Sequence, residues 1–318
     1  MFILSFQTTF LASLQILMMA LVGYVLIRKR MINEEALGTF SWLVINVFLP
    51  SFILSQLLGN FSFQLYPNWW IFPLLSFAVT LGGFAVGQVV LLCYKEAAAK
   101  KEFLSLVSFQ NSGYLPLILV ATLFSPEQAQ ILYVYIFLFL IGFDLVLWSW
   151  GVRVLARQPI EKFEIRNLIH SPVVAILASL VMITWGFQKF VPLFIMKPLK
   201  MLGDCTLPLA MIVLGGNLAA LRASEFKSRE IGLVLMIKLL VLPLVALSVV
   251  LIFRMDFLIG FLIVLEAAVP SAVSLSVIAR HYKIEEGLIN QALFLGHLAC
   301  VVTIPVFLML YTRLRGGF

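Results

Sequence analysis

Ten long apolar segments, separated only by short polar connectors, constrain this chain more than any other feature. A transmembrane helix needs about 20 consecutive, mainly apolar residues, and each segment meets that length. Only 12% of the 318 residues are charged, too few for the polar surface of a soluble domain of this size. We therefore predict an all-α integral membrane protein with no soluble domain. The expected spans are residues 6–27, 37–58, 69–94, 103–124, 129–152, 167–188, 196–221, 231–253, 257–279 and 287–312.

The 22 lysines and arginines are divided unequally between alternate connectors. Fifteen lie after odd-numbered spans, six lie in the other connectors or near the C-terminus, and Lys238 lies inside a span. Because positive residues stay in the cytoplasm, we expect a multi-pass cell-membrane protein with both termini outside, in the periplasm or extracellular space. The connector 189–200, with three lysines, departs from this pattern. The net charge of +7 fits lipid headgroups and does not call for a nucleic-acid partner.

Two prolines recur at similar spacing in the two halves of the chain. Pro50 is matched by Pro208 at an offset of 158, and Pro116 by Pro270 at an offset of 154. Five spans per half is an odd number, so the second half must be inserted upside down, as in inverted-repeat transporters. Chance is the alternative for two matched prolines. The predicted repeats are residues 1–158 and 159–318.

The fourth span carries a polar cluster, a glycine and a proline near its middle. Gln110, Asn111 and Ser112 bring hydrogen-bonding groups to a depth where unpaired polar groups are costly. Gly113 tolerates irregular dihedrals, and Pro116 lacks a backbone N–H. These residues predict a broken helix that lines a water-filled cavity.

The ninth span repeats this pattern around Pro270, with Ser271 and Ser274 following it. Two breaks at matching positions of inverted halves are expected to meet near the midplane of the bilayer. Each second half-helix would then direct its positive N-terminal end at the meeting point, which favours a small anion such as a carboxylate. The alternative is that both prolines only kink packed helices. The candidate substrate-binding residues are Gln110, Asn111, Ser112, Gly113, Pro116, Pro270, Ser271 and Ser274.

Ionisable side chains inside the spans are the candidates for binding a coupling ion, which would be H⁺ or Na⁺. Glu266 is the first of these, because it lies one helical turn before Pro270 and burial favours the neutral, proton-carrying form of a carboxyl group. A structural pairing of Glu266 is the equal alternative. Lys238 is expected to snorkel or to act in transport, and a lone histidine such as His297 is more often structural. The further coupling-ion candidates are Asp204 and Asp144.

Several motifs resemble those of the auxin efflux carrier family. The segment 110–117, QNSGYLPL, resembles the fourth-span motif of that family, and VPSAV at 269–273 resembles its ninth-span motif. LGGNLA at 214–219 is similar to its small-residue segment in span 7. The similarity covers essentially the whole chain, and the length and number of spans agree. The family includes plant auxin exporters, the PIN-like members, and bacterial malate or malonate permeases.

The resemblance implies ten helices in two inverted five-helix repeats, with broken helices 4 and 9 crossing in a transport domain. It implies elevator-like alternating access against a scaffold domain, with Asn111, Pro116 and Pro270 at the substrate. The asparagine that plant members have beside the second crossover proline is not evident here, and Ser271 or Ser274 would take its place. The long cytoplasmic loop of some plant members is absent, which favours a permease of the prokaryotic type.

These observations together predict a secondary active transporter for a small organic anion. A channel or receptor for such an anion is the first alternative, and an intramembrane enzyme is a weaker one. The sequence holds no HExxH or CxxC motif and no paired catalytic constellation, so we expect no cofactor and no metal site. The expected partners are the anion, a coupling ion and the lipid bilayer, and a homodimer is left open.

Overall fold

Apolar helices make up most of the computed structural model, which describes residues 6–94, 99–155, 170–220, 228–282, 284 and 286–316. Seven helices are long and apolar enough to cross a membrane, and three shorter apolar helices accompany them. Each of the ten predicted segments overlaps one of these helices, and the all-helical fold with several possible membrane spans agrees with a multi-pass membrane protein. The inverted arrangement of two five-helix repeats stays a prediction.

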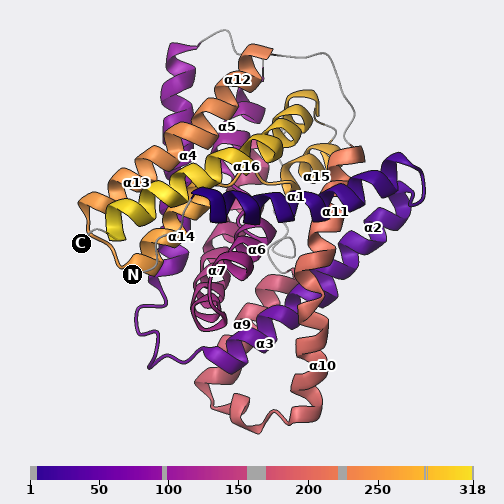
Figure 1. The fold of residues 1–318 in the computed structure, drawn as a ribbon, viewed down its shortest axis with the longest axis vertical. Coiled ribbons are helices and arrows are strands. Elements are labelled where there is room, and N and C mark those ends of the chain that lie inside the picture. The colour runs from indigo at the N-terminus through magenta and orange to yellow at the C-terminus, as the bar shows by residue number, and fades with distance from the viewer. Residues whose placement is uncertain are drawn as a thin grey trace.

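The helices keep the following order along the chain (Figure 1). They are α1 (Phe6–Arg28), α2 (Glu34–Leu43), η1 (Val44–Phe48), α3 (Leu49–Asn60), α4 (Ile71–Cys93), α5 (Lys100–Ser108), α6 (Tyr114–Leu123), α7 (Pro126–Val146), η2 (Leu147–Gly151), α8 (Val152–Leu155), α9 (Ser171–Thr184), η4 (Phe187–Phe190), α10 (Leu193–Asp204), α11 (Thr206–Ala220), α12 (Ser228–Met236), η5 (Ile237–Val241), α13 (Leu242–Ile252), α14 (Phe257–Ala268), α15 (Ser274–His281) and α16 (Gly287–Gly316).

One group of helices is built around α1, which packs across α11 and also contacts α16 (Figure 1). Glycines make the α1–α11 contact possible. A Cβ on Gly215 would lie 1.7 Å from the Ala20 carbonyl oxygen, and one on Gly23 would lie 1.8 Å from the Ile212 carbonyl oxygen. Small residues of this kind let membrane helices approach backbone to backbone. In the same region, α3 packs against α9 and α10.

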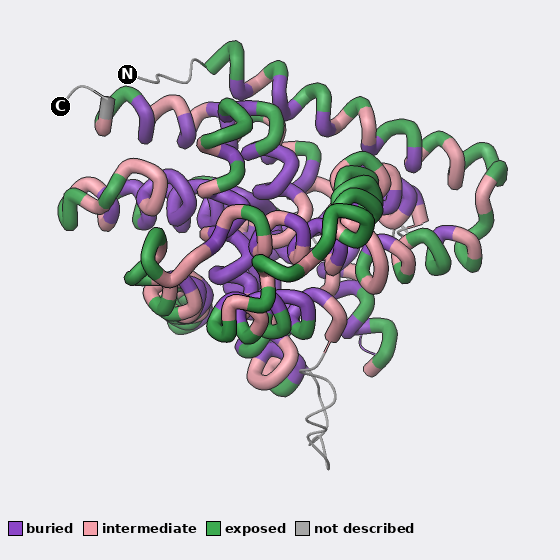
Figure 2. The backbone as a smooth tube through the Cα atoms, turned by 90° about the horizontal axis from the view of Figure 1, so that it is seen from below, coloured by how far each residue is buried: buried purple, intermediate pink, exposed green. Residues whose placement is uncertain are grey.

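A second group of helices carries the two broken segments. The long helix α7 packs along α4, and α4 packs along α5, the first half of the broken fourth segment. The first half of the broken ninth segment, α14, packs between α13 and α16. These contacts hold the two breaks in the interior, where Figure 2 shows mainly buried backbone.

The outer helices expose large apolar side chains that a soluble protein would bury. Leu11, Met18 and Leu21 on α1 and Leu81 and Leu92 on α4 are all exposed. A lipid environment removes the cost of that exposure, because hydrocarbon tails solvate apolar side chains. Figure 2 shows the same pattern, with exposed residues along outer helices around a buried centre.

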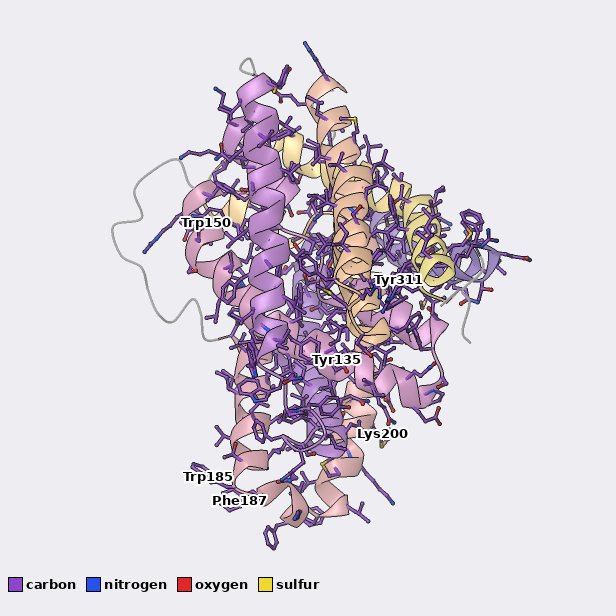
Figure 3. All side chains as sticks on the ribbon, turned by 90° about the vertical axis from the view of Figure 1, so that its left-hand side faces the viewer. Tyr135, Trp150, Trp185, Phe187, Lys200 and Tyr311 are labelled. Carbon is purple, nitrogen blue, oxygen red and sulfur yellow. The ribbon has the colours of Figure 1, made fainter. Side chains whose placement is uncertain are left out.

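Aromatic side chains gather in the connector between α9 and α10, at one end of the molecule. Trp185 and Phe187 point outward there, and their exposed fractions are 67% and 52% (Figure 3). Gly186 turns the chain between them with φ 75°, a left-handed value that glycine adopts at little cost. Tryptophan near the membrane–water interface is a common anchor. Of the three lysines that depart from the charge pattern, Lys189 lies in this connector, and Lys197 and Lys200 lie on α10.

Candidate functional site

The fourth apolar segment is interrupted between α5 and α6. Residues 109–113 are not helical, and Gly113 caps α6 with φ −88° and ψ −92°. Pro116 is the third residue of α6, so it lies in the first turn, where the helix has no use for its missing N–H. The predicted break is therefore confirmed, and the proline belongs to the restart of the helix and not to the break itself.

The ninth apolar segment is interrupted in the same way between α14 and α15. Pro270 lies inside this gap, which runs over residues 269–273. The second half-helix, α15, is eight residues long and ends in Arg280 and His281. A positive side chain in the last turn, such as that of Arg280, interacts favourably with the negative C-terminal end of the helix dipole.

The two breaks cross and hydrogen-bond to each other. Gln110 and Ser271 form an antiparallel bridge. The Asn111 N–H donates to the Pro270 carbonyl at 2.8 Å, and the Ala272 N–H donates to the Phe109 carbonyl at 3.0 Å. The Ser271 hydroxyl donates to the carbonyl of Leu106 at 2.6 Å. Backbone groups that the broken helices cannot satisfy internally are thus paired across the crossing, as burial in a membrane protein requires.

A cavity of about 200 Å³ opens beside the crossing. The first residues of α6 and α15 line it, so the positive ends of two half-helices border the same space. The rest of the wall is mainly apolar and comes from η1, α3, α7, η2, α9 and α11. Among the described residues that line the cavity there is no lysine or arginine.

The structure brings most of the predicted substrate-binding residues together at this cavity. Pro270 and Ser271 instead hold the crossing through the bridge, and Pro116 lies inside α6. None of these three lines the cavity as the structure describes it. The five predicted residues that line it are Gln110, Asn111, Ser112, Gly113 and Ser274.

The side chain of Asn111 is oriented by His297, a residue on α16. The Asn111 Nδ2 atom lies 3.1 Å from Nε2 of His297, and Nδ1 of that ring lies 2.7 Å from the Leu293 carbonyl oxygen. Because a carbonyl only accepts, Nδ1 carries the proton and Nε2 accepts from the asparagine amide. The sequence predicted a structural role for His297 but gave no sign of its contact with Asn111.

Behind the crossing lies a buried acid and a buried base. Glu266 on α14 is fully buried, and Lys238 in the π-helical turn η5 is 1% exposed. Ser112 and Lys238 act electrostatically on the Glu266 carboxyl, although neither of its oxygens has a partner in hydrogen-bonding geometry among the described residues. The expectation that Lys238 snorkels is wrong, because the side chain is enclosed by protein and faces an acid.

A second acid–base pair lies on the cavity side of the crossing. Asp144 on α7 and His170, the residue that precedes α9, both line the cavity, and Oδ2 of Asp144 lies 3.5 Å from Nε2 of His170. The Trp148 ring packs edge-on against the imidazole, with centroids 5.4 Å apart. Sequence reasoning singled out Asp144 but missed His170, which lies near the start of the sixth predicted span, 26 residues further along the chain.

The third predicted acid, Asp204, lies elsewhere. It borders a separate cavity of about 300 Å³ together with Gln56 and Tyr133. None of the described residues that line the crossing cavity borders this second cavity. Asp204 is therefore not part of the site at the crossing.

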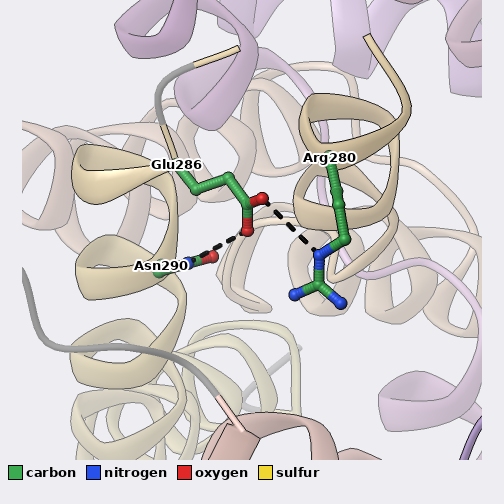
Figure 4. A network of polar contacts seen from close by, with 3 residues as sticks. All are labelled: Arg280, Glu286 and Asn290. Atoms are coloured by element: carbon green, nitrogen blue, oxygen red, sulfur yellow. Dashed lines mark hydrogen bonds and ion pairs between the residues drawn. The ribbon is translucent and has the colours of Figure 1, made fainter. Parts of the chain in front are cut away.

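A polar cavity of about 480 Å³ lies where α15 ends and α16 begins. Figure 4 shows its network, in which Glu286 Oε1 lies 3.5 Å from Arg280 Nε and Glu286 Oε2 accepts from the Asn290 amide at 3.3 Å. Glu34 on α2 and Ala220 on α11 close the other side. The network ties the end of the second half-helix to α16 on the side where the connectors are rich in lysine and arginine.

Comparison with known proteins agrees with this architecture. The model of a family described as "Membrane transport protein" matches residues 8–169 and 160–308, nearly the whole chain. The chain belongs to this family, the auxin efflux carrier family.

Two curated relatives of this carrier extend the comparison. It is 27% identical over 306 residues to an "Uncharacterized transporter" of Methanothermobacter thermautotrophicus, covering 92% of the chain and 95% of the relative. It is 27% identical over 182 residues to "Protein PIN-LIKES 2" of Arabidopsis thaliana, covering 51% of the chain and 38% of that protein. The family is one of membrane transporters, so the auxin efflux carrier resemblance drawn from the motifs is confirmed. Within the described ranges no group of three His, Cys, Asp or Glu side chains is placed to hold a metal ion.

Proposed function

We propose that this family member is a secondary active transporter for a small organic anion, a carboxylate such as malate, malonate or an auxin-like weak acid. One observation carries the proposal: the N-terminal ends of α6 and α15 border the same cavity, beside the Asn111 amide. The unused N–H groups of a helix N-terminus and its dipole favour a negative group. Two such ends at one cavity make a site that a carboxylate fits better than a cation or a neutral solute.

The chemistry of the cavity wall suits transport as well as binding. No lysine or arginine is among its described residues, so a bound carboxylate would meet amides and helix ends and not a full positive charge. A carrier must release its substrate on the other side of the membrane. Without a direct ion pair the affinity for the substrate stays moderate, so that release is not prevented. Gln110, Asn111, Ser112, Gly113 and Ser274 are the groups we assign to the substrate.

The volume of the cavity favours a small solute. Pockets for drug-sized ligands usually measure about 300–1,000 Å³, and this one measures about 200 Å³. Malonate and malate fit such a space more readily than an indole acid does. We therefore rank the short dicarboxylates first among the candidate substrates.

The proposed transport cycle is alternating access of the elevator type, which the family resemblance implies. Two five-helix repeats, residues 1–158 and 159–318, would be related by inversion, with both termini outside. The start of α1 and the end of α16 lie close together in Figures 1 and 2, which is compatible with termini on the same side of the membrane. The helices around the crossing would move against the group formed by α1, α3, α9, α10 and α11. A channel or receptor would not show saturable flux with counterflow.

The coupling ion would be H⁺ or Na⁺. Glu266 and Asp144 are both adjacent to the crossing, one behind it and one in the cavity, whereas Asp204 borders a different cavity. Placement therefore favours the first two as groups that sense whether the substrate site is occupied.

Uptake into proteoliposomes tests the proposal. Purified wild-type protein is expected to give saturable, counterflow-competent uptake of labelled malate or malonate. Asn111→Ala should lower the initial rate at low substrate concentration about tenfold, which corresponds to about 1.4 kcal/mol of lost binding in the transition state. Asn68→Ala, a matched change on an exposed connector, should leave the rate unchanged.

Two results would overturn this assignment. The first is a folded Asn111→Ala protein, with wild-type melting temperature, that transports at the wild-type rate. The second is wild-type protein that neither binds nor moves malate, malonate or indole acetate.

A further inference from the structure

An acidic side chain lines the cavity that we assign to an anion. Asp144 borders the same space as Asn111 and Ser274. A carboxylate there would repel a bound carboxylate, because like charges a few ångströms apart inside a protein interact by several kcal/mol. The site can therefore take an anion only when the charge of Asp144 is compensated.

The compensating group is held in place by its surroundings. His170 Nε2 lies 3.5 Å from Asp144 Oδ2, an ion-pair distance that is longer than a hydrogen bond. The next residue, Ser171, donates its hydroxyl to Asn46 Oδ1 at 2.6 Å, and the His170 carbonyl accepts the Val174 N–H at 3.0 Å, which fixes the start of α9. The side chains of His170 and Asp144 are 24% and 15% exposed, and both residues line the cavity.

We propose that the Asp144–His170 pair is the proton site that couples anion binding to proton uptake, an assignment that rests on the proposed function. With one proton on the pair, an imidazolium faces a carboxylate and the pair is neutral. Without it, the imidazole is neutral and the pair carries one negative charge. The pair therefore binds one proton when a carboxylate binds in the cavity. The carrier would then transport the anion and the proton together, as an anion–proton symporter.

The neighbouring ionisable groups support this assignment. Tyr114 on α6 is the other ionisable side chain among the described residues of the cavity wall, and Asp144 acts electrostatically on its hydroxyl. A tyrosine side chain ordinarily loses its proton only near pH ~10. It is therefore neutral around neutral pH, where a histidine ordinarily gains or loses its charge. On α14, which also packs against α7, the ionisable residue is Glu266, and it faces Ser112 and Lys238.

Linkage makes the proposal measurable. If a proton raises the affinity for the anion by some factor, the anion raises the affinity for the proton by the same factor. Calorimetric titration of the full-length protein in detergent with malate, in two buffers of different ionisation enthalpy, counts the protons taken up. Between roughly pH 6.5 and 8.5 malate stays ionised, because carboxylic acids ordinarily titrate near pH 4, so the protons counted belong to the protein.

The expected results differ between variants. Wild type should take up close to one proton per malate near the upper end of that range, and its affinity should fall about tenfold from the lower end to the upper. Asp144→Asn should bind malate without proton uptake and without this pH dependence. His170→Gln should bind about tenfold more weakly than wild type at the lower pH, and the double variant should recover binding with no pH dependence. One control is His281→Gln, the same change at an exposed position, and the other is Glu35→Gln, which likewise replaces an exposed carboxylate by its amide.

The possible outcomes separate the two proposals. Wild type that binds and transports malate with no proton uptake overturns the coupling role and leaves the anion carrier standing. So does an Asp144→Asn protein that keeps the wild-type pH dependence. Wild type that binds none of malate, malonate and indole acetate overturns both. The proton count on wild type needs no variant, so a variant that fails to fold does not decide the question.

Discussion

The two faces of the crossing each carry one acid and one base, but in different surroundings. On the cavity face, Asp144 and His170 are partly exposed and come from helices that pack in different groups. On the back face, Glu266 and Lys238 are enclosed by protein. Exposure decides what each pair can do: the first lies at the cavity and can exchange protons with it, whereas the second is shut off from solvent, so we expect it to act mainly on the stability of the crossing. The back pair is therefore expected to matter most for stability and the front pair for transport.

The largest expected effect is on the back face. Lys238→Met leaves the buried Glu266 carboxyl without its basic neighbour, and leaving a buried polar group without its partner costs about 1–3 kcal/mol. We expect a clearly lower midpoint in thermal unfolding followed by tryptophan fluorescence in detergent. Lys200→Met, on the exposed side of α10, is the control and should unfold like wild type.

The double variant Lys238→Met with Glu266→Leu sharpens this test. Removing both charges should restore much of the lost stability, since no uncompensated charge remains. A Lys238→Met protein as stable as wild type would contradict a stabilising role of this pair. Glu266 would then remain a candidate for binding the coupling proton.

A smaller effect is expected at the cavity face from His297. His297→Leu removes the acceptor for the Asn111 amide, so the amide is no longer oriented toward one side of the cavity. Malate uptake into proteoliposomes should fall severalfold, up to about tenfold, for a loss of about 1 kcal/mol, the usual net value of one hydrogen bond. His297→Gln offers a new acceptor and should recover part of the rate. Equal rates for the leucine and glutamine variants would argue against an orienting role.

The smallest effect is expected away from both faces. Asp204→Asn changes a cavity separate from the crossing, so uptake should change less than about twofold, within the ±0.5 kcal/mol typical of substitutions outside special sites. The measurement is the same uptake assay at low and saturating malate. A loss as large as that of Asn111→Ala would mean that the second cavity belongs to the transport path.

The breaks could be predicted because their cause is local. A polar run next to Gly113, and a proline at position 270 with hydroxyls after it, leave a membrane helix no regular way to continue. The role of Pro116 was harder to predict, because the same residue suits either a kink or the first turn of a new helix. Only the position of the helix start, at Tyr114, decides between the two.

Pairings between distant helices could not be predicted in the same way. His170 meets Asp144, and His297 meets Asn111 across 186 residues, because separate helices pack together. Lys238 shows the same limit from the other side. Its depth along α12 and α13 suggested a path to the headgroups, but the direction of its side chain depends on which neighbour covers that face of the helix.

The hydrogen bonds between the two helix breaks, at residues 110 and 271, have a mechanical consequence. Main-chain hydrogen bonds join the two interrupted segments to each other. If one segment rotated or shifted alone, these bonds would break and leave unpaired amide groups inside the membrane protein. If the proposed elevator movement takes place, both segments would therefore be displaced together, as one rigid unit. Bending would then be expected in the connectors that join this unit to the helices around it.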